Sequence, residues 1–437
     1  MITCFVLLAI LYQSDESEYG VQERFRVDFV RLDLLVLDRD GNPVTDLRPD
    51  ELVIKENGKT IQLELFESVD YREFFANTPA GELPTEEPGV TVPEGPVPQF
   101  IFALDLESIP LVEMRKTFSQ LRETLSDGSF PEAANYLLYS MESGVISDGF
   151  IKGYKALVAD LNLFEDRMIE RYEKEINSRS NATGQSFRGS GRAATGPRDL
   201  EGLESHVESC LIALRRPSPP PETVRDAMVC VSDALSAYQE QETNAVRRVI
   251  GEIEALTYRF QENEGLKTLF LISPGFSLYP GREGKGLAEF LVSGYFPLGS
   301  SVGLNSMEDE FRRVTHACIR NRVVFHTMDI YGVVDEVRSV HARYFHGKNP
   351  ETKVFYRDYL SSYTTGLTTL AKESGGFHLR APSLVNSISK VIPRLRFSYL
   401  LAYPSPDGKP GKFRNIKIKC KRKGVELHYR QGYFGPS

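Results

Sequence analysis

The chain has 437 residues, of which 41% are hydrophobic and 26% are charged, so it is long enough to bury a large core and to form two or three domains. This composition excludes a disordered or fibrous protein. The formal net charge of -8 is modest and is spread along the chain, so we expect no nucleic-acid partner.

Residues 1–20 contain an apolar stretch, 2–12, that resembles the hydrophobic region of a secretory signal peptide. The positively charged start and a clean small-residue cleavage site are missing, and a short N-terminal strand or tail is the alternative. No other segment has the roughly 18 consecutive apolar residues of a membrane helix. We therefore expect a secreted, periplasmic or cell-envelope protein without an integral membrane span.

Residues 21–75 show a pattern typical of antiparallel strands. Apolar residues alternate with polar ones from Phe25, and turns are indicated at 40–43 and at Asn57-Gly58. Residues 76–98 contain six prolines together with Gly and Glu, a composition that favours an extended linker. This segment marks a domain boundary.

Residues 99–393 predict an α/β domain with a mostly parallel sheet covered by helices on both faces. Strands are expected at 99–105, 135–140, 267–273, 322–328 and 376–380, and helices from near Leu111 and from Pro221 to about 262. The region 150–220 reads as an insertion that could bind a partner. It begins with an amphipathic helix carrying Leu157 and Leu161, and its Gly/Ser/Arg-rich part, 178–197, is expected to be disordered.

The cysteines are not arranged as in zinc or thioredoxin-type sites, because none stands in a Cys-x-x-Cys pair. Cys210 and Cys230 flank a Pro-rich turn between two predicted helices. They could form a disulfide in an oxidising compartment, or they could remain free and buried.

Residues 394–437 return to a strand pattern. Lys417, Lys419 and Lys421 alternate with apolar residues and are expected on the solvated face of a strand. Three terminal strands alone make a marginal sheet. We therefore expect them to pack with the N-terminal strands into one small β-sandwich, with the α/β domain inserted between the two sets.

The run from Pro98 to Leu104 predicts a strand buried on both faces, which places Asp105 at its carboxyl end. Open α/β sheets bind ligands at that edge. The simplest alternative is that the Asp105 carboxylate caps the helix that starts near Leu111.

Several stretches, taken in order, resemble the von Willebrand factor A-related domain family known mainly from acidobacteria. They are 36–44, 50–58, 102–105, 267–276, 399–403, 411–419 and 430–434. The resemblance implies a Rossmann-like von Willebrand A domain flanked by strands in an exported bacterial protein. Such domains generally bind proteins, often through a divalent cation, and enzymatic activity is not expected of them.

The metal-ion-dependent adhesion site of von Willebrand A domains begins with Asp-x-Ser-x-Ser, and here the matching positions are Asp105, Glu107 and Ile109, with Ser108 out of register. A second acid normally follows a later strand as Thr-Asp-Gly, where this chain has Ser273-Pro274-Gly275. The candidate ligand-binding residues are Asp105, Glu107, Ser108 and Ser273. A Mg²⁺ or Ca²⁺ ion would have only Asp105 and Glu107 as acidic ligands, so we expect a degenerate site with no cofactor.

These observations favour a non-enzymatic, exported protein-interaction or adhesion module with an unidentified protein partner. Two alternatives remain open. One is a hydrolase-like α/β enzyme with an unrecognised site around Asp105, Glu107 and Asp329, which a deep pocket joining these carboxylates would favour. The other is a structural envelope component, for which stable homo-oligomers would be the sign. Residues Gly281 to Gly286 lack the spacing of a phosphate-binding loop and read as a mobile loop.

Overall fold

The computed structural model describes residues 29–76, 97–105, 111–131, 133–141, 144–147, 149–183, 200–260, 267–298, 306–330, 351–379, 384–405 and 412–434. The expected signal segment, most of the Pro-rich linker, and Glu107 and Ser108 lie outside the described residues.

The described strands are β1 (Phe29–Leu37), β2 (Leu52–Glu56), β3 (Lys59–Ile61), β4 (Leu65–Asp70), β5 (Gln99–Leu104), β6 (Asn135–Ser140), β7 (Gly144–Val145), β8 (Ile151–Lys152), β9 (Lys267–Ser273), β10 (Val323–Asp329), β11 (His378–Leu379), β12 (Phe397–Pro404), β13 (Phe413–Cys420), β14 (Glu426–His428) and β15 (Gly432–Phe434). The described helices are α1 (Arg72–Ala76), α2 (Leu111–Ser126), α3 (Tyr154–Thr183), α4 (Leu200–Leu211), α5 (Pro221–Arg259), α6 (Arg282–Val292), α7 (Glu308–Arg320), α10 (Lys353–Ser374) and α11 (Leu384–Val391), with 3₁₀ helices η1 (Pro49–Glu51), η2 (Ile212–Arg215) and η3 (Ile392–Arg396).

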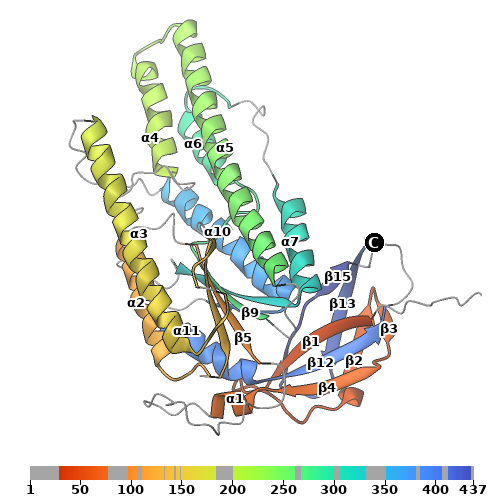
Figure 1. Ribbon diagram of the computed structural model, residues 1–437. Coiled ribbons are helices and arrows are strands. Elements are labelled where there is room, and N and C mark those ends of the chain that lie inside the picture. The colour runs from red at the N-terminus through yellow and green to blue at the C-terminus, as the bar shows by residue number, and fades with distance from the viewer. Residues whose placement is uncertain are drawn as a thin grey trace, which may run out of the picture.

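The protein is a mixed α/β structure built around one mostly parallel sheet (Figure 1). Its strand order is β11-β10-β9-β5-β6-β7, and β8 also pairs with β6. The strands β11, β10, β9, β5 and β6 are parallel to one another, whereas β7 and β8 run antiparallel to β6. The five parallel strands are the five that the sequence predicts, although β11 is shorter than expected.

Helices cover both faces of this sheet because alternate strand residues point to opposite sides. On one face, Phe100, Phe102 and Phe270 pack against α2, α3 and α11. On the other face, Ile101 and Leu271 pack against α7, α10 and the C-terminal half of α5. The strands are therefore buried on both sides, which is why their sequences read as nearly continuous apolar runs.

The two ends of the chain pair with each other in two antiparallel sheets of four strands, with orders β14-β1-β12-β4 and β15-β13-β2-β3. In the first sheet, β12 lies between β1 and β4. In the second, β13 pairs with β2 and β15. One hydrophobic cluster, which includes Leu32, Ile54, Leu401 and Ile416, joins the inner faces of the two sheets. The lysines of β13 are on its exposed face, as expected.

The longest helix, α5, has 39 residues and therefore extends roughly 58 Å. Its C-terminal half packs on the central sheet, whereas its N-terminal half packs with α4, α6 and the start of α10 in a separate hydrophobic cluster. The segment formed by α4, η2 and the first half of α5, residues 200–240, is called here the helical arm. Figure 1 shows the arm extending well beyond the sheet.

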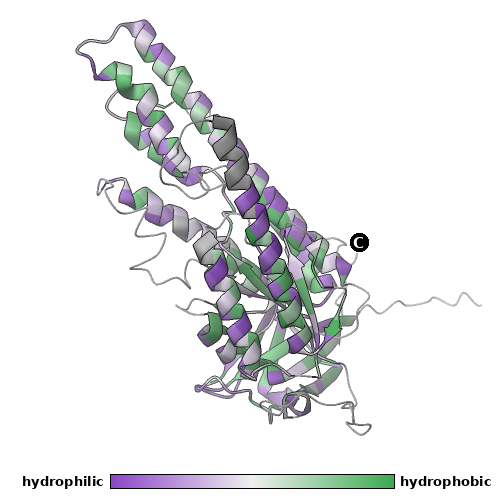
Figure 2. Ribbon diagram, turned by 60° about the vertical axis from the view of Figure 1, so that its left-hand side comes forward, coloured by the Kyte–Doolittle hydropathy of each residue, from purple (hydrophilic) through white to green (hydrophobic). Residues whose placement is uncertain are grey.

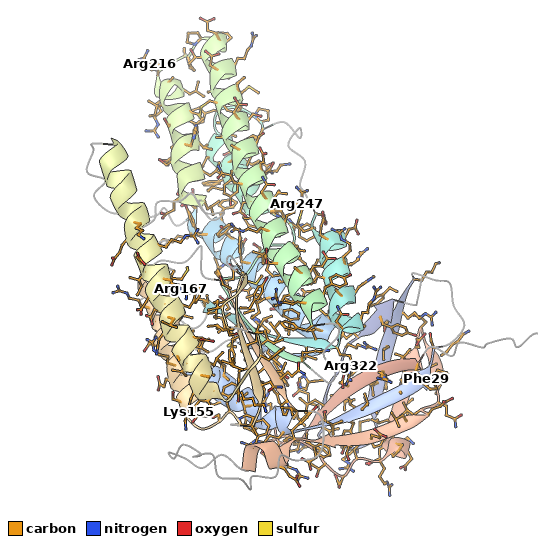
Figure 3. All side chains as sticks on the ribbon, in the orientation of Figure 1. Phe29, Lys155, Arg167, Arg216, Arg247 and Arg322 are labelled. Carbon is orange, nitrogen blue, oxygen red and sulfur yellow. A yellow bond between two sulfur atoms is a disulfide. The ribbon has the colours of Figure 1, made fainter. Side chains whose placement is uncertain are left out.

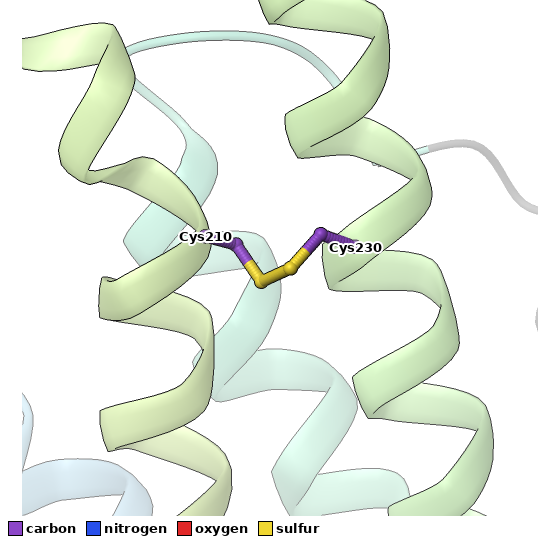
Figure 4. The surroundings of a disulfide bond; sticks show 2 residues. All are labelled: Cys210 and Cys230. Carbon is purple, nitrogen blue, oxygen red and sulfur yellow. A yellow bond between two sulfur atoms is a disulfide. The ribbon is translucent and has the colours of Figure 1, made fainter.

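A disulfide joins the two helices of the arm. Cys210 on α4 and Cys230 on α5 are bonded, with their Cα atoms 5.8 Å apart (Figure 4). Of the two arrangements open from the sequence, the free and buried pair is therefore wrong. Cys318 and Cys420 are free.

Two expectations for loops are wrong. Residues 178–183, expected to be disordered, continue α3 to Thr183, and 184–199 lie outside the described residues. Residues 281–286, expected to be a mobile loop, form the N-cap and first turns of α6. The glycines there serve helix packing, because a Cβ on Gly284 would stand 2.3 Å from the Tyr238 ring. Helix α5 ends at Arg259, slightly earlier than expected.

Candidate functional site

Three central strands of the parallel sheet end in polar residues at the same level. Leu104 of β5 is opposite Ile272 of β9, and Ser273 of β9 is opposite Asp329 of β10. Asp105, Ser273 and Asp329 therefore form one row across the carboxyl edge of the sheet, here called the Asp105 row. Neighbouring strands lie about 4.8 Å apart, so side chains of adjacent members can touch.

The Asp105 row lies where the direction of strand succession reverses. From β5 the chain adds β6 and β7 on one side of the sheet, and it then adds β9, β10 and β11 on the other side. Asp105 and Ser273 stand on the two strands that flank this reversal. Open α/β sheets bind their ligands in the crevice at such a switch point.

Asp105 is held by a hydrogen bond from the neighbouring strand. The Ser273 hydroxyl donates to Asp105 Oδ2 at 2.6 Å, and the Gly275 amide donates to Ser273 Oγ at 3.0 Å. Asp105 is 4% exposed and Ser273 is fully buried. A charge-assisted hydrogen bond of this kind contributes about 1.5–3 kcal/mol, and it commits the single proton of Ser273 to the carboxylate.

Asp329 has a similar partner from a helix. The Thr364 hydroxyl of α10 donates to Asp329 Oδ2 at 3.0 Å, and Asp329 is 7% exposed. Each carboxylate of the row thus accepts a hydrogen bond from a buried hydroxyl of the same protein. These hydrogen bonds stabilise both carboxylates.

The loop that follows Ser273 is fixed against α10 by close backbone contacts. Gly275 has φ +91°, and a Cβ there would stand 2.5 Å from the Tyr363 carbonyl oxygen. The Phe276 amide donates to that same carbonyl at 3.0 Å. Pro274, at the position of the expected second acid, has no oxygen side-chain ligand to offer. The loop therefore positions backbone rather than a metal-binding carboxylate.

A second group of buried acids next to the row is satisfied by tyrosines of α10. The Tyr363 and Tyr359 hydroxyls both donate to Glu242 of α5, the latter at 3.4 Å, and the Tyr356 hydroxyl donates to Glu204 of α4 at 2.5 Å. Burial, with a smaller contribution from Glu242, raises the pKa of Tyr238 in the same cluster. The Tyr356 hydroxyl thus attaches α10 to the helical arm, and the Tyr359 and Tyr363 hydroxyls attach it to α5 just beyond the arm.

Neither of the two cavities described in the structure joins the carboxylates of the Asp105 row. A cavity lies at the opposite, amino ends of the strands and another lies around the end of α6, and no residue of the Asp105 row lines either. The segments that directly follow Asp105 and β10 lie outside the described residues, so the enzyme alternative stays a prediction.

Among the described residues, one group of potential metal ligands occurs away from the row. The ligand atoms of His206, Cys210 and Cys230 lie within 4.8 Å of one another. The two sulfur atoms are joined in the disulfide, so they cannot act as thiolate ligands in this state.

The structure brings together two of the sequence-predicted site residues, Asp105 and Ser273, and places the third acid of the enzyme hypothesis, Asp329, one strand further along. Glu107 and Ser108 lie outside the described residues, so their part in a site stays a prediction. The alternative role of Asp105 as a cap of α2 stays a prediction, because residues 106–110, which precede this helix, lie outside the described residues.

Sequence reasoning missed Thr364 and Tyr363. The sequence feature that could have indicated them is the hydroxyl-rich helical segment 361–369, Ser-Ser-Tyr-Thr-Thr-Gly-Leu-Thr-Thr. A helix that carries so many hydroxyls next to a predicted sheet edge offers donors for buried carboxylates.

None of the described helices is long and apolar enough to cross a membrane. No family model, curated protein or solved structure gives a significant match to the chain.

Proposed function

We propose that the protein is a non-enzymatic, exported protein-interaction module, related to von Willebrand A domains, whose metal-ion-dependent adhesion site is degenerate. The observation that carries the proposal is the closed Asp105 row. Asp105 accepts its hydrogen bond from Ser273, and Pro274 stands where a second metal-binding acid is expected.

The strand order supports the proposed fold relationship. If β5, β6, β7, β9, β10 and β11 are numbered one to six in chain order, the sheet reads 3-2-1-4-5-6. This is the order of doubly wound Rossmann folds. The antiparallel sheets formed by the two chain ends fit an α/β domain inserted in a β-sandwich.

The helical arm is the surface that we assign to the partner. Near its outer end, the large apolar side chains of Ile212, Met228 and Val229 are 60%, 41% and 54% exposed. Figure 2 shows hydrophobic segments along the projecting helices up to their far end. Exposed apolar side chains grouped beside a rigid support are typical of a protein-binding surface.

The disulfide supports the proposals that the helical arm is rigid and that the protein is exported. Closing a loop of 20 residues between Cys210 and Cys230 restricts the unfolded arm and contributes about 3 kcal/mol in the chain-entropy description. Such bonds persist in oxidising compartments outside the cytoplasm. A preformed arm also loses less conformational entropy when it binds.

The test uses two substitutions on the same helix. Val229→Glu places a charge at the exposed end of the arm, and Tyr258→Glu places the same charge on α5 about 44 Å away, at a side chain that is 42% exposed. The partner is identified by crosslinking in an envelope extract of the native host, and its affinity for each purified variant is then measured by biolayer interferometry.

We expect Val229→Glu to weaken binding about tenfold or more, because a charge would be buried in an apolar contact, and Tyr258→Glu to bind as wild type. Equal affinity of the two variants would reject the arm as the binding surface. Catalytic turnover by the purified protein that is lost in Asp105→Asn would reject the non-enzymatic assignment.

A further inference from the structure

A cavity of about 70 Å³ lies at the amino ends of the parallel strands, on the side of the sheet opposite to the Asp105 row. The first residues of β5 and β10 line it together with residues of β1 and β12, so it lies between the central sheet and the first antiparallel sheet. Figure 3 labels Arg322 at this junction. The cavity is called here the Arg430 cavity, after its most unusual wall residue.

The charges in the wall of the Arg430 cavity do not balance. Arg322 Nη2 is 2.7 Å from Asp33 Oδ1, so these two groups neutralise each other. The Arg430 guanidinium donates to the backbone carbonyls of Ile319, at 3.1 Å, and Arg31. No carboxylate of the described residues lies within ion-pair distance of Arg430. Asp33 also attracts Arg430 electrostatically, so the described wall holds two guanidinium groups for one carboxylate. An excess positive charge of this kind is costly away from bulk water.

The cavity wall also holds buried N–H donors without an acceptor. Nε of Arg322, Nε of Arg430 and Nε2 of His326 are buried and make no hydrogen bond within the described part of the protein. His428 Nε2, in the same wall, also makes no hydrogen bond, although Glu426 Oε1 lies 3.1 Å from it. More than 90% of buried polar groups in native proteins are paired, so these unpaired groups around one cavity call for an explanation. An acceptor bound in the cavity would supply it.

The tautomer of His326 is fixed by its surroundings. Its Nδ1 accepts a hydrogen bond from the Phe377 amide at 3.2 Å, so in the neutral ring the proton is on Nε2. The ring packs between Phe270 and Phe377, with centroids 5.4 Å from each, and the residue is 1% exposed. Burial lowers the pKa of His326 to about 3, so this ring is a neutral donor at physiological pH.

Arg430 is brought to the cavity by a backbone contact that requires glycine. Gly375 has φ +90°, and a Cβ there would stand 3.1 Å from the Arg430 amide nitrogen. Arg322 itself has φ +53°, which is uncommon for a residue with a side chain. The two guanidinium groups are therefore placed by defined backbone geometry on both sides of the junction.

We propose that the Arg430 cavity binds a small organic carboxylate. Its carboxylate group would pair with Arg430 and Arg322, and its short alkyl chain would contact the aromatic wall that includes Phe75, Phe100 and Phe377. One excess positive charge matches a monoanion, and a guanidinium fork matches the two oxygens of a carboxylate. The wall is mainly apolar, so it offers too few donors for phosphate or sulfate.

The test is calorimetric titration of sodium butyrate into the full chain in a chloride buffer, with phosphate and sulfate as comparison anions. We expect saturable butyrate binding to wild type, weakened about 100-fold in Arg430→Met and about tenfold in His326→Phe, which keeps the aromatic stacking but removes the donor. The control Arg357→Met removes an exposed arginine of α10 away from the cavity, and its affinity should stay within about twofold of wild type.

Circular dichroism establishes that each variant is folded, and Arg430→Lys replaces Arg430→Met if the latter does not fold. The lysine variant keeps the charge but loses the fork, so weakened binding is expected for it as well. The proposal is overturned if folded wild type gives no saturable heat with butyrate, if binding survives the Arg430 substitution, or if phosphate and sulfate bind as tightly as butyrate.

Discussion

The side chain of Asp105 shows how a single contact can decide the character of this sheet edge. Its carboxylate is buried and needs donors, and the Ser273 hydroxyl supplies one at 2.6 Å. A cation would have to replace that donor and find further oxygen ligands, which Pro274 does not provide. Ser273, a candidate ligand-binding residue from the sequence, thus acts as a hydrogen-bond donor to the acid.

A buried histidine makes stability depend on pH. The pKa of His326 is about 3 in the folded protein, because burial and the neighbouring His428 disfavour its charged form, and about 6.5 in the unfolded chain. Between these values the unfolded chain binds more protons, so the free energy of unfolding falls as the pH decreases from 6.5 towards 3. One such histidine contributes a slope of up to about 1.4 kcal/mol per pH unit.

We therefore predict that urea unfolding between pH 7 and 4.5 shows a smaller loss of stability in His326→Phe than in wild type. Some pH dependence should remain, because burial also lowers the pKa of His316, to about 4. Parallel curves for the two proteins would show that His326 does not titrate on unfolding as argued.

Within the helices, we predict that replacing glycine by alanine has opposite effects on stability at two positions. Gly366 lies in α10, where a Cβ would stand 2.2 Å from the Phe276 carbonyl oxygen, whereas Gly251 lies in α5 with nothing within 4 Å of a Cβ. Gly251→Ala should stabilise the protein by about 1 kcal/mol through helix propensity. Gly366→Ala should destabilise it by about 2 kcal/mol or more, because α10 must move away from the loop after β9.

Chemical denaturation of the two alanine variants, compared with wild type, measures both effects. If Gly366→Ala were as stable as Gly251→Ala, the close contact between α10 and the switch-point loop would be refuted. The placement of Thr364 beside Asp329 depends on that contact, so it would lose its support as well.

Local pattern predicts the strands well because each is a short apolar run that ends in a polar residue, as at Asp105 and Ser273. Pattern cannot predict which helix contributes a donor, since Thr364 and Asp329 meet only through the packing of α10 on the sheet. For the same reason, local pattern does not predict the first turn of α6. Its glycines suggest a loop locally, yet Gly284 is needed for the approach of Tyr238.

For the whole molecule, the sequence shows β patterns at both ends but not the order in which the strands pair. The ends interleave, with β12 between β1 and β4, because their inward residues share one core that includes Leu32 and Leu401. As a result, the amino ends of the central parallel strands face the antiparallel sheets, and their carboxyl ends face away from them. The Arg430 cavity and the Asp105 row occupy these two opposite edges.

We propose that the internal hydrogen bonds of the Asp105 row take the place of an adhesion-type cation. Calorimetric titration of Mg²⁺, Ca²⁺ and Mn²⁺ into wild type and Asp105→Ala tests it most directly. We predict no saturable heat with any of the three ions for either protein. Saturable heat in wild type that disappears in Asp105→Ala would instead establish a metal-dependent site at this edge.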